Sequence, residues 1–293
     1  MFVSFLSNKE AMMEFTDSHC HLDFSAFDAN LSQLLQQCDT NNIHRIIVPA
    51  VKPSHWQRVI SLTEKITPIN ITCSLGFHPW FVIQQDINLP KNYDVASQEL
   101  KLKQAIIDNH SSHQNKIVAI GECGIDIGKA KTSTRNEDEY NKNIQLQEAF
   151  FEMQLGIAKE NNLPVIIHHC QSHPLILALL KQYKLANAGV IHAFSGSYQQ
   201  AKDYVNLGFK LGIGGTITYP RAKKTIDAVK RLPLSSLLLE TDAPSMPPFG
   251  TQGSNNSPLN VLAVFQALSV IRDEPATMIA AQIEHNVEEL FFN

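Results

Sequence analysis

Short apolar runs alternate along this chain with segments whose apolar residues recur at helical spacing. Each apolar run is short enough to be a buried strand, whereas Phe150, Met153 and Ile157 line one face of a helix. Such alternation is typical of parallel βα units. The predicted strands are Glu14–His19, Arg45–Ala50, Asn70–Gly76, Lys116–Gly121, Pro164–His168, Ala188–His192, Phe209–Ile213 and Ser236–Thr241.

Eight strands, each followed by a helix, predict a single-domain α/β fold, the (β/α)8 TIM barrel, whose usual length is about 250 residues. An open doubly wound sheet is the competitor, but no Gly-x-Gly-x-x-Gly sequence opens the first βα unit. The chain continues beyond the eighth predicted strand. There, the segments Pro258–Ile271 and Pro275–Leu290 are predicted to be extra C-terminal helices. Pro90–Gln114 and the polar stretch Gly128–Lys142 are interpreted as insertions.

The composition is that of one sizeable globular domain, with 44% hydrophobic residues among 293. We expect the barrel to span residues 14–293 and residues 1–13 to be an N-terminal extension. No apolar run approaches the roughly 20 residues that span a bilayer. The opening residues also lack the basic region of a secretion signal. We therefore expect a cytoplasmic protein that does not associate with membranes.

The cysteines and the net charge narrow the possible functions. The five cysteines are widely spaced and include no Cys-x-x-Cys pair, which argues against a disulfide framework and a zinc finger. A formal net charge of -4 gives no general attraction to nucleic acid. A nuclease with this composition would need bound metals and local basic residues to attract its substrate.

Histidines and carboxylates fall at the C-terminal ends of five predicted strands, the end where TIM barrels carry their active sites. His19 and His21 are two residues apart, so strand alternation points both to one face. Glu122 and His192 each follow an apolar run. A carboxylate at such a position needs a partner for its charge, which a metal or a basic side chain would supply.

Two strand ends offer more than one candidate. The fifth strand ends in His168-His169, and its apolar residues occupy both faces, so the pattern leaves open which histidine points inward. The eighth strand ends in Glu240-Thr-Asp242, which places two carboxylates on one face. Asp242 could bind a metal and also accept a proton from a bound water.

Four histidines and two carboxylates are too many for one tetrahedral zinc, and they suit two metals about 3.5–4 Å apart. Such a pair lowers the pKa of a water molecule to near 7 and neutralises charge on a phosphoryl or carbonyl oxygen. Hydrolysis is therefore the predicted reaction. Zn²⁺, Mn²⁺, Ni²⁺ and Mg²⁺ all remain possible, because a His/Glu/Asp set accepts each of them.

The motifs DSHCHLD, GFHP, GECGID, HAFSG and ETDAP, in this order, resemble the TatD-related metal-dependent hydrolases over nearly the whole chain. LGIGGTITYPRA and LPLSSLLLETDAP look especially like the YjjV branch of that family. The resemblance implies a deoxyribonuclease or phosphodiesterase with Glu122 and Asp242 as catalytic residues, acting on DNA or a small phosphodiester. It implies two divalent metal cations held by His19, His21, Glu122, His168, His192 and Asp242.

The resemblance also selects His168 over His169, and it exposes one departure. Related chains usually carry an arginine two residues after that histidine, whereas this chain has Cys170. A thiol cannot present a bidentate cation to a phosphate. Cys170 is interpreted as a neutral space-filling residue, with an additional thiolate ligand as the alternative.

Three further residues are candidates for substrate binding or for support of the ligands. His78 could contact substrate, stand behind a metal ligand, or cap a turn. Glu240 could orient His19 or His21, or form a salt bridge inside the barrel. Arg221 belongs to a basic cluster after the seventh strand, where barrels often bind phosphate, although such clusters usually face solvent.

Two other functions are compatible with these residues. An amidohydrolase could cleave an amide or ester, such as a D-aminoacyl substrate, at the same metal site, although many of those enzymes bridge their metals with a carbamylated lysine in place of Glu122. A non-catalytic barrel that binds nucleic acid is the second alternative. No feature of the sequence calls for an obligate protein partner.

Overall fold

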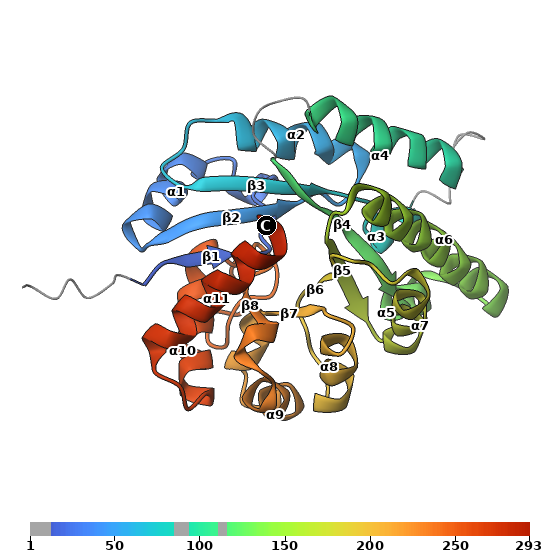
Figure 1. Ribbon diagram of the computed structural model, residues 1–293. Coiled ribbons are helices and arrows are strands. Elements are labelled where there is room, and N and C mark those ends of the chain that lie inside the picture. Colours follow the sequence, from blue (N-terminus) through green and yellow to red (C-terminus); the bar gives the residue numbers. More distant parts are fainter. Residues whose placement is uncertain (1–12, 85–93, 111–115) are drawn as a thin grey trace, which may run out of the picture.

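The computed structural model describes residues 13–84, 94–110 and 116–293. Within these ranges, eight parallel strands form one sheet in which each strand pairs with the next along the chain. Helices surround this sheet (Figure 1), which confirms the predicted (β/α)8 barrel. The strands are β1 (Phe15–Asp17), β2 (Ile43–Pro49), β3 (Asn70–Leu75), β4 (Ile117–Asp126), β5 (Val165–Cys170), β6 (Gly189–Ile191), β7 (Lys210–Ile213) and β8 (Leu237–Leu239).

The helices follow the strands in the order expected for βα units. They are α1 (Leu31–Thr40), α2 (Pro53–Glu64), α3 (Pro79–Gln84), α4 (Val95–His110), α5 (Ile127–Ser133), α6 (Glu137–Asn161), α7 (His173–Tyr183), α8 (Tyr198–Val205), α9 (Lys223–Arg231), α10 (Val261–Ile271) and α11 (Ala276–Phe291). Short 3₁₀ turns occupy Ser25–Phe27, Gly215–Thr218, Leu234–Ser236 and Pro258–Asn260. None of the helices among the described residues has both the length and the apolar character needed to cross a membrane.

The predicted accessory segments can be placed on this frame. The two C-terminal helices correspond to α10 and α11. The stretch Gly128–Lys142 forms most of α5 and the first turns of α6, with a short non-helical connection between them. The stretch Pro90–Gln114 contains α4, and its ends lie outside the described residues. Of the predicted extension, only Met13 is described, and it packs against the core.

The barrel closes between the ends of β1 and β8. Ser18 N donates to Leu239 O at 3.0 Å, and beyond the strands His21 N donates to Ala243 O at 2.8 Å. In the opposite direction, Asp242 N donates to His19 O at 2.9 Å. Closure therefore brings the His19–His21 segment and Asp242 together, although more than 200 residues separate them in the sequence.

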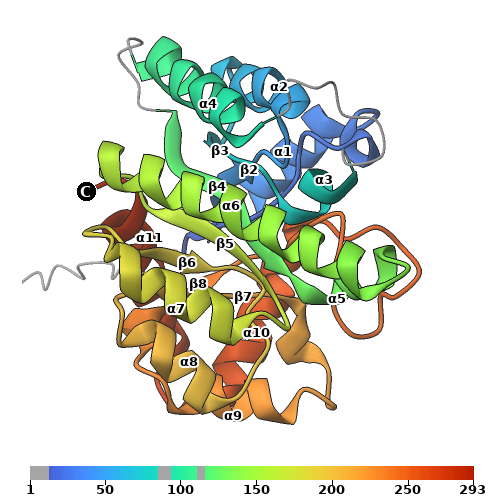
Figure 2. The ribbon, with the colours of Figure 1, turned by 90° about the vertical axis from the view of Figure 1, so that its right-hand side faces the viewer.

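Helix α11 covers the opposite end of the barrel. Figure 2 shows α11 and the C-terminus at one end, and α3, α5 and the loop after β8 at the other. Val287, Leu290 and Phe291 pack on interior residues of the strands. Arg45 donates to Glu288 at 2.6 Å and Lys210 donates to Glu289 at 2.7 Å, and these contacts anchor the helix to β2 and β7. With that end plugged, substrate access is confined to the end where the strands terminate.

Two buried glutamines of α6 hold the loops that come after β3 and β4. Gln154 Oε1 accepts from Phe77 N, and Gln147 Oε1 accepts from Asp126 N, both at 2.7 Å. Buried backbone groups that lie beyond a strand need such partners. These two bonds therefore fix the backbone next to His78 and at Asp126, two positions at the mouth of the barrel.

The contact between α11 and β1 makes stability depend on pH. Glu284 accepts from Thr16 N and Thr16 Oγ1, each at 2.7 Å. Burial outweighs these bonds and raises the pKa of Glu284 from 4.5 to about 7. The folded protein therefore keeps a proton that the unfolded chain has released, so the free energy of unfolding falls as pH rises through that window.

We predict that Glu284→Gln flattens this pH dependence, because glutamine carries no titrating proton. Between pH 4.5 and 7, the free energy of unfolding of the wild type should fall by on the order of 2–3 kcal/mol more than that of Glu284→Gln. Urea unfolding at several pH values measures it. Glu289→Gln on the same helix is the control. Lys210 lowers the pKa of Glu289, so any pH dependence that Glu289 contributes occurs below the pH window of Glu284. Parallel pH curves for Glu284→Gln and wild type would contradict the prediction.

Candidate metal centre

Glu122 lies at the centre of the barrel mouth because β4 contains an extra residue. Pairing with β5 passes from Ile120–Val165 to Cys123–Ile167, so β4 bulges at Gly121–Glu122. Gly121 has φ +139°, and a Cβ there would lie 2.6 Å from Ile166 O, so glycine is required. The strand continues to Asp126, beyond the predicted end at Gly121. The Glu122 carboxylate is consequently buried among histidines.

One ligand group faces Glu122 Oε2. His19 Nε2 is 3.3 Å and His21 Nε2 is 3.6 Å from this oxygen. Asp242 Oδ1 is 3.7 Å from His19 Nε2 and 3.4 Å from His21 Nε2. His19, His21 and Asp242 form what we term the first ligand group, and closure of the barrel between β1 and β8 assembles it.

A second ligand group faces the other oxygen of the same carboxylate. Glu122 Oε1 is 3.1 Å from His78 Nε2, 3.2 Å from His168 Nδ1 and 3.0 Å from His192 Nε2. These histidines follow β3, lie on β5 and follow β6, respectively. We term them the second ligand group. Glu122 thus stands between two clusters and offers one oxygen to each.

The donor atoms fit divalent metal ions. In a tetrahedral site with metal–nitrogen bonds of about 2.0–2.1 Å, neighbouring ligand atoms are about 3.3 Å apart, and the separations here run from 3.0 to 3.7 Å. His19 Nε2 and Glu122 Oε2 are buried without a hydrogen bond, an arrangement that is costly unless a further partner joins them. Three overlapping sets of residues therefore have metal-binding geometry: His19–His21–Asp242, His19–Glu122–His192 and His78–Glu122–His168.

The histidines around Glu122 and Asp242 keep both carboxylates ionised, which favours the binding of cations. Burial alone would raise the pKa of Glu122, but His78, His192 and His19 outweigh it and hold that pKa well below its usual range. Burial would likewise raise the pKa of Asp242, but the hydrogen bond with His21 and the other histidines lower it. Both carboxylates are therefore anionic at neutral pH, as metal ligation requires.

Comparison with known proteins agrees with this site. A family model described as "TatD related DNase" matches residues 16–292. The chain belongs to this family. It is 40% identical over 94% of its length to the metal-dependent hydrolase YjjV of Escherichia coli strain K12, of which it covers 97%. The crystal structure of Escherichia coli YjjV superimposes with a TM-score of 0.81 at 38% identity, over 95% of this chain and 98% of that one.

A more distant relative carries an activity in its name. The human protein named deoxyribonuclease TATDN3 is 26% identical, over 94% of this chain and 93% of that protein. The TatD model covers every predicted ligand of this chain, from His19 to Asp242. The resemblance seen in the sequence motifs is thus confirmed at the level of the family.

Polar groups behind the ligands fix the ring orientation of the histidines in this TatD-family site. Pro49 O lies 3.2 Å from His21 Nδ1, and since a carbonyl only accepts, that nitrogen carries the hydrogen. Asp126 Oδ2 accepts from His168 Nε2 at 2.9 Å in the same way. Each ring therefore turns its other nitrogen towards Glu122, and this is the nitrogen that would ligate a metal after losing its proton.

Asp126 is a supporting residue that sequence reasoning missed. Its Oδ2 also accepts from Trp80 Nε1 at 2.5 Å, and its Oδ1 accepts from Lys129 N at 2.6 Å. Burial raises the pKa of Asp126, but the hydrogen bond from His168 and the others outweigh it, so the carboxylate is anionic. Its position four residues after Glu122, on the same strand face, was the available signal.

Two more acidic side chains support the ligands from behind. Glu240 lies 3.5 Å from His192 Nδ1 and accepts from Ala193 N at 2.6 Å, so its partner is His192 and not the expected His19 or His21. A Cβ at Gly212 would lie 1.9 Å from Glu240 Oε2, so glycine makes room for the carboxylate. Asp17, which sequence reasoning also missed, accepts from His19 N at 3.2 Å.

The remaining candidates lie at the edge of the site. His169 points out of the barrel and packs on Tyr204, so His168 is the inward histidine. Cys170 is half-buried next to Asp126, and burial raises the pKa of its thiol to about 11, which leaves it neutral. Arg221 is exposed at the rim, with its guanidinium 5.0 Å from the ring centre of Tyr219.

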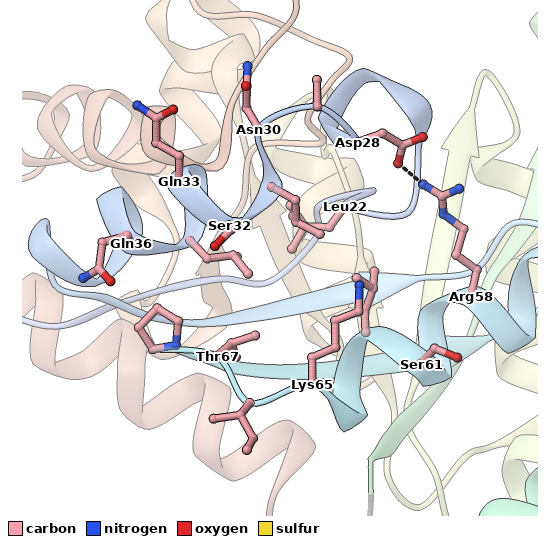
Figure 3. Close-up of a pocket in the computed structure, with 16 residues that line it drawn as sticks. Leu22, Asp28, Asn30, Ser32, Gln33, Gln36, Arg58, Ser61, Lys65 and Thr67 are labelled. Atoms are coloured by element: carbon pink, nitrogen blue, oxygen red, sulfur yellow. Dashed lines mark hydrogen bonds and ion pairs between the residues drawn. The ribbon is translucent and has the colours of Figure 1, made fainter.

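One sizeable cavity is unrelated to the metal centre. It measures about 1080 Å³ and lies between α1 and α2, outside the barrel (Figure 3). Neutral polar side chains such as Gln33 and Thr67 line it, and an ion pair between Arg58 and Asp28 stands at one side. No residue of either ligand group contributes to its wall. Both ligand groups of this TatD-family chain lie at the barrel mouth, away from this cavity.

We predict that Asp126→Asn weakens metal binding by the second ligand group about tenfold or more, because a neutral amide orients and polarises His168 less well. Calorimetric titration of the metal-free protein with Zn²⁺ or Mn²⁺ measures the affinity. The matched control is Asp203→Asn, which disturbs a 3.3 Å contact with His173 on the outside of the barrel. Equal titration curves for Asp126→Asn and the control would refute this role.

Proposed function

We propose that this TatD-family metal-dependent hydrolase is a phosphodiesterase that uses two divalent metals and acts on DNA or a small phosphodiester. The observation that carries the proposal is the position of Glu122, whose two oxygens each face a separate ligand group. His19, His21 and Asp242 would hold one metal, and His168 and His192 the other, with Glu122 shared. When bound, the pair supplies a water of lowered pKa and neutralises charge on a phosphoryl oxygen.

Asp242 is the proposed proton acceptor. Its side chain is 14% exposed against 2% for Glu122, so it reaches the space where substrate enters. The hydrogen bond with His21 lowers the pKa of Asp242 despite its burial, so the carboxylate is ionised at neutral pH, as a proton acceptor must be. Glu122 is too enclosed for this task, and we assign it the bridging role.

His78 is the proposed donor to the substrate, although it belongs to the second ligand group. Its Nδ1 accepts from Trp80 N at 3.1 Å, so the hydrogen of the neutral ring is on Nε2, the nitrogen that faces Glu122. Burial lowers the pKa of His78 to about 4, so the ring is neutral at neutral pH. A protonated nitrogen cannot ligate a metal, but it can donate to a phosphoryl oxygen.

Phosphodiesters are favoured over amides by the family and by the rim of the site. The matching family model describes DNases, and a human relative is named a deoxyribonuclease. The rim also carries an exposed Trp80, with Lys129 Nζ 5.3 Å from its ring centre. An aromatic ring beside a cation suits a nucleotide, because the base can stack and the phosphate can pair. An amide or D-aminoacyl substrate has neither a base that needs an aromatic ring nor a phosphate that needs a cation.

The test is turnover of a model phosphodiester, bis(p-nitrophenyl) phosphate, and of labelled DNA. We expect the metal-loaded protein to hydrolyse them, EDTA to stop the reaction, and His19→Ala or Asp242→Ala to lower turnover at least a hundredfold while the circular dichroism spectrum is unchanged. His173→Ala, outside the barrel, is the control that should retain activity. Turnover of D-aminoacyl substrates alone would establish the amidohydrolase instead, and DNA binding without turnover would establish a binding barrel.

A second experiment separates donor from ligand at His78. We expect His78→Ala to keep the wild-type metal content and to lower kcat about a hundredfold, as for the loss of a donor that stabilises charge in the transition state. His78→Gln, which restores an N–H, should recover part of this loss. Elemental analysis and steady-state kinetics on the same preparations give both quantities. A drop in metal content would show that His78 is a ligand.

A further inference from the structure

A second cavity opens in the loops after β6, β7 and β8, and two of these loops also carry His192 and Asp242. It has a volume of about 360 Å³, which is within the range of cavities that hold single small molecules. Ser195 follows His192 by three residues, and Met246 follows Asp242 by four. The described residues that line it are Ser195, Thr216, Tyr219, Arg221, Ala222, Met246 and Pro247.

The lining combines hydrogen-bond donors with an apolar platform. The Arg221 guanidinium lies over the Tyr219 ring, 5.0 Å from its centre, and Ser195 and Thr216 border the same space. Met246 also lines this space, and it is 38% exposed. None of the described lining residues is acidic. A ligand with an anionic group and a flat apolar group would satisfy both halves of this wall.

The wall is held in shape without a ligand. Tyr219 Oη donates to Pro247 O at 2.8 Å, and Phe249 N donates to Thr218 Oγ1 at 2.8 Å, so the loops after β7 and β8 are tied together. Ala222 is the N-cap of α9 and makes no side-chain capping bond, so the positive end of that helix adds to the attraction of an anion. A preformed cavity loses less entropy when it binds.

From these observations we propose that this cavity is a nucleotide subsite, which rests on the phosphodiesterase function proposed above. Arg221 binds a phosphate oxygen of the nucleotide next to the scissile bond, and its base or sugar packs on Tyr219 and Met246. Across the mouth, after β3 and β4, Trp80 and Lys129 form a separate aromatic and cationic pair. The scissile phosphate at Glu122 thus lies between two sites that each suit one nucleotide.

The test compares probes with and without a nucleoside. Wild type, Arg221→Ala and Arg221→Lys are assayed on thymidine 5′-(p-nitrophenyl phosphate), thymidine 3′-(p-nitrophenyl phosphate) and methyl p-nitrophenyl phosphate. For Arg221→Ala we expect the ratio of kcat/KM between at least one nucleoside probe and the methyl probe to fall about tenfold, mainly through KM, because a charged hydrogen bond is lost. Arg221→Lys should restore part of this ratio.

The control is Arg231→Ala, which removes another exposed guanidinium that lies over a tyrosine ring, 3.7 Å from the centre of Tyr198, but lines no part of the cavity. Its ratio should equal that of the wild type. An unchanged ratio in Arg221→Ala for both nucleoside probes would overturn the subsite while the phosphodiesterase function stands.

A binding measurement keeps the two proposals separate. If wild type hydrolyses none of the probes, the proposed function fails, and the cavity is judged by calorimetric titration with thymidine 5′-monophosphate alone. An affinity at least tenfold weaker in Arg221→Ala than in Arg231→Ala supports a nucleotide site. Equal affinity in the two variants, or no binding to wild type, overturns it.

Discussion

The structure depends on one buried carboxylate that must keep its charge. Glu122 is almost completely enclosed, and an isolated carboxylate in that position would take up a proton. Histidines on both of its oxygens prevent this and hold its pKa low. The same histidines cannot all be protonated, because His19 and His192 stack at 3.9 Å and repel each other when both are charged. Some of these ligand atoms therefore carry no proton. Divalent cations bind best to deprotonated ligands.

Much of the barrel serves to hold this carboxylate and its partners in place. The bulge in β4 turns Glu122 towards the mouth, and closure between β1 and β8 supplies the first ligand group. The second ligand group depends on a more extended support. Gln154 and Gln147 of α6 hold the loops after β3 and β4, and through them His78 and Asp126. Packing at the outer helix is thereby linked to the geometry of the site.

The fold and the six expected ligands could be predicted from the sequence, because a parallel barrel gathers the residues that follow its strands at one end. The structure brings these six residues together there. The errors of the sequence-based prediction have physical causes. The β4 bulge adds one residue to the pairing, which is invisible to a pattern of period two, and so the strand seemed to end at Gly121. Asp126 and Asp17 looked like ordinary loop and strand residues, because their importance comes from histidines that tertiary structure brings to them. His168 and His169 differ only in strand register, and the contact of His169 with Tyr204 shows that His169 is the one that points outward.

The departure at Cys170 now has a structural consequence. With its thiol pKa raised to about 11, Cys170 adds no charge beside Asp126 and supplies no cation for a phosphate. In a chain with a net charge of -4, the attraction of the proposed phosphodiester must then come from elsewhere at the mouth. Arg221 and Lys129 stand on opposite sides of the ligand groups, each over an aromatic ring. On the proposed function, cations paired with rings in this way would recognise a phosphate together with the base attached to it, whereas an arginine on β5 would contact the phosphate alone.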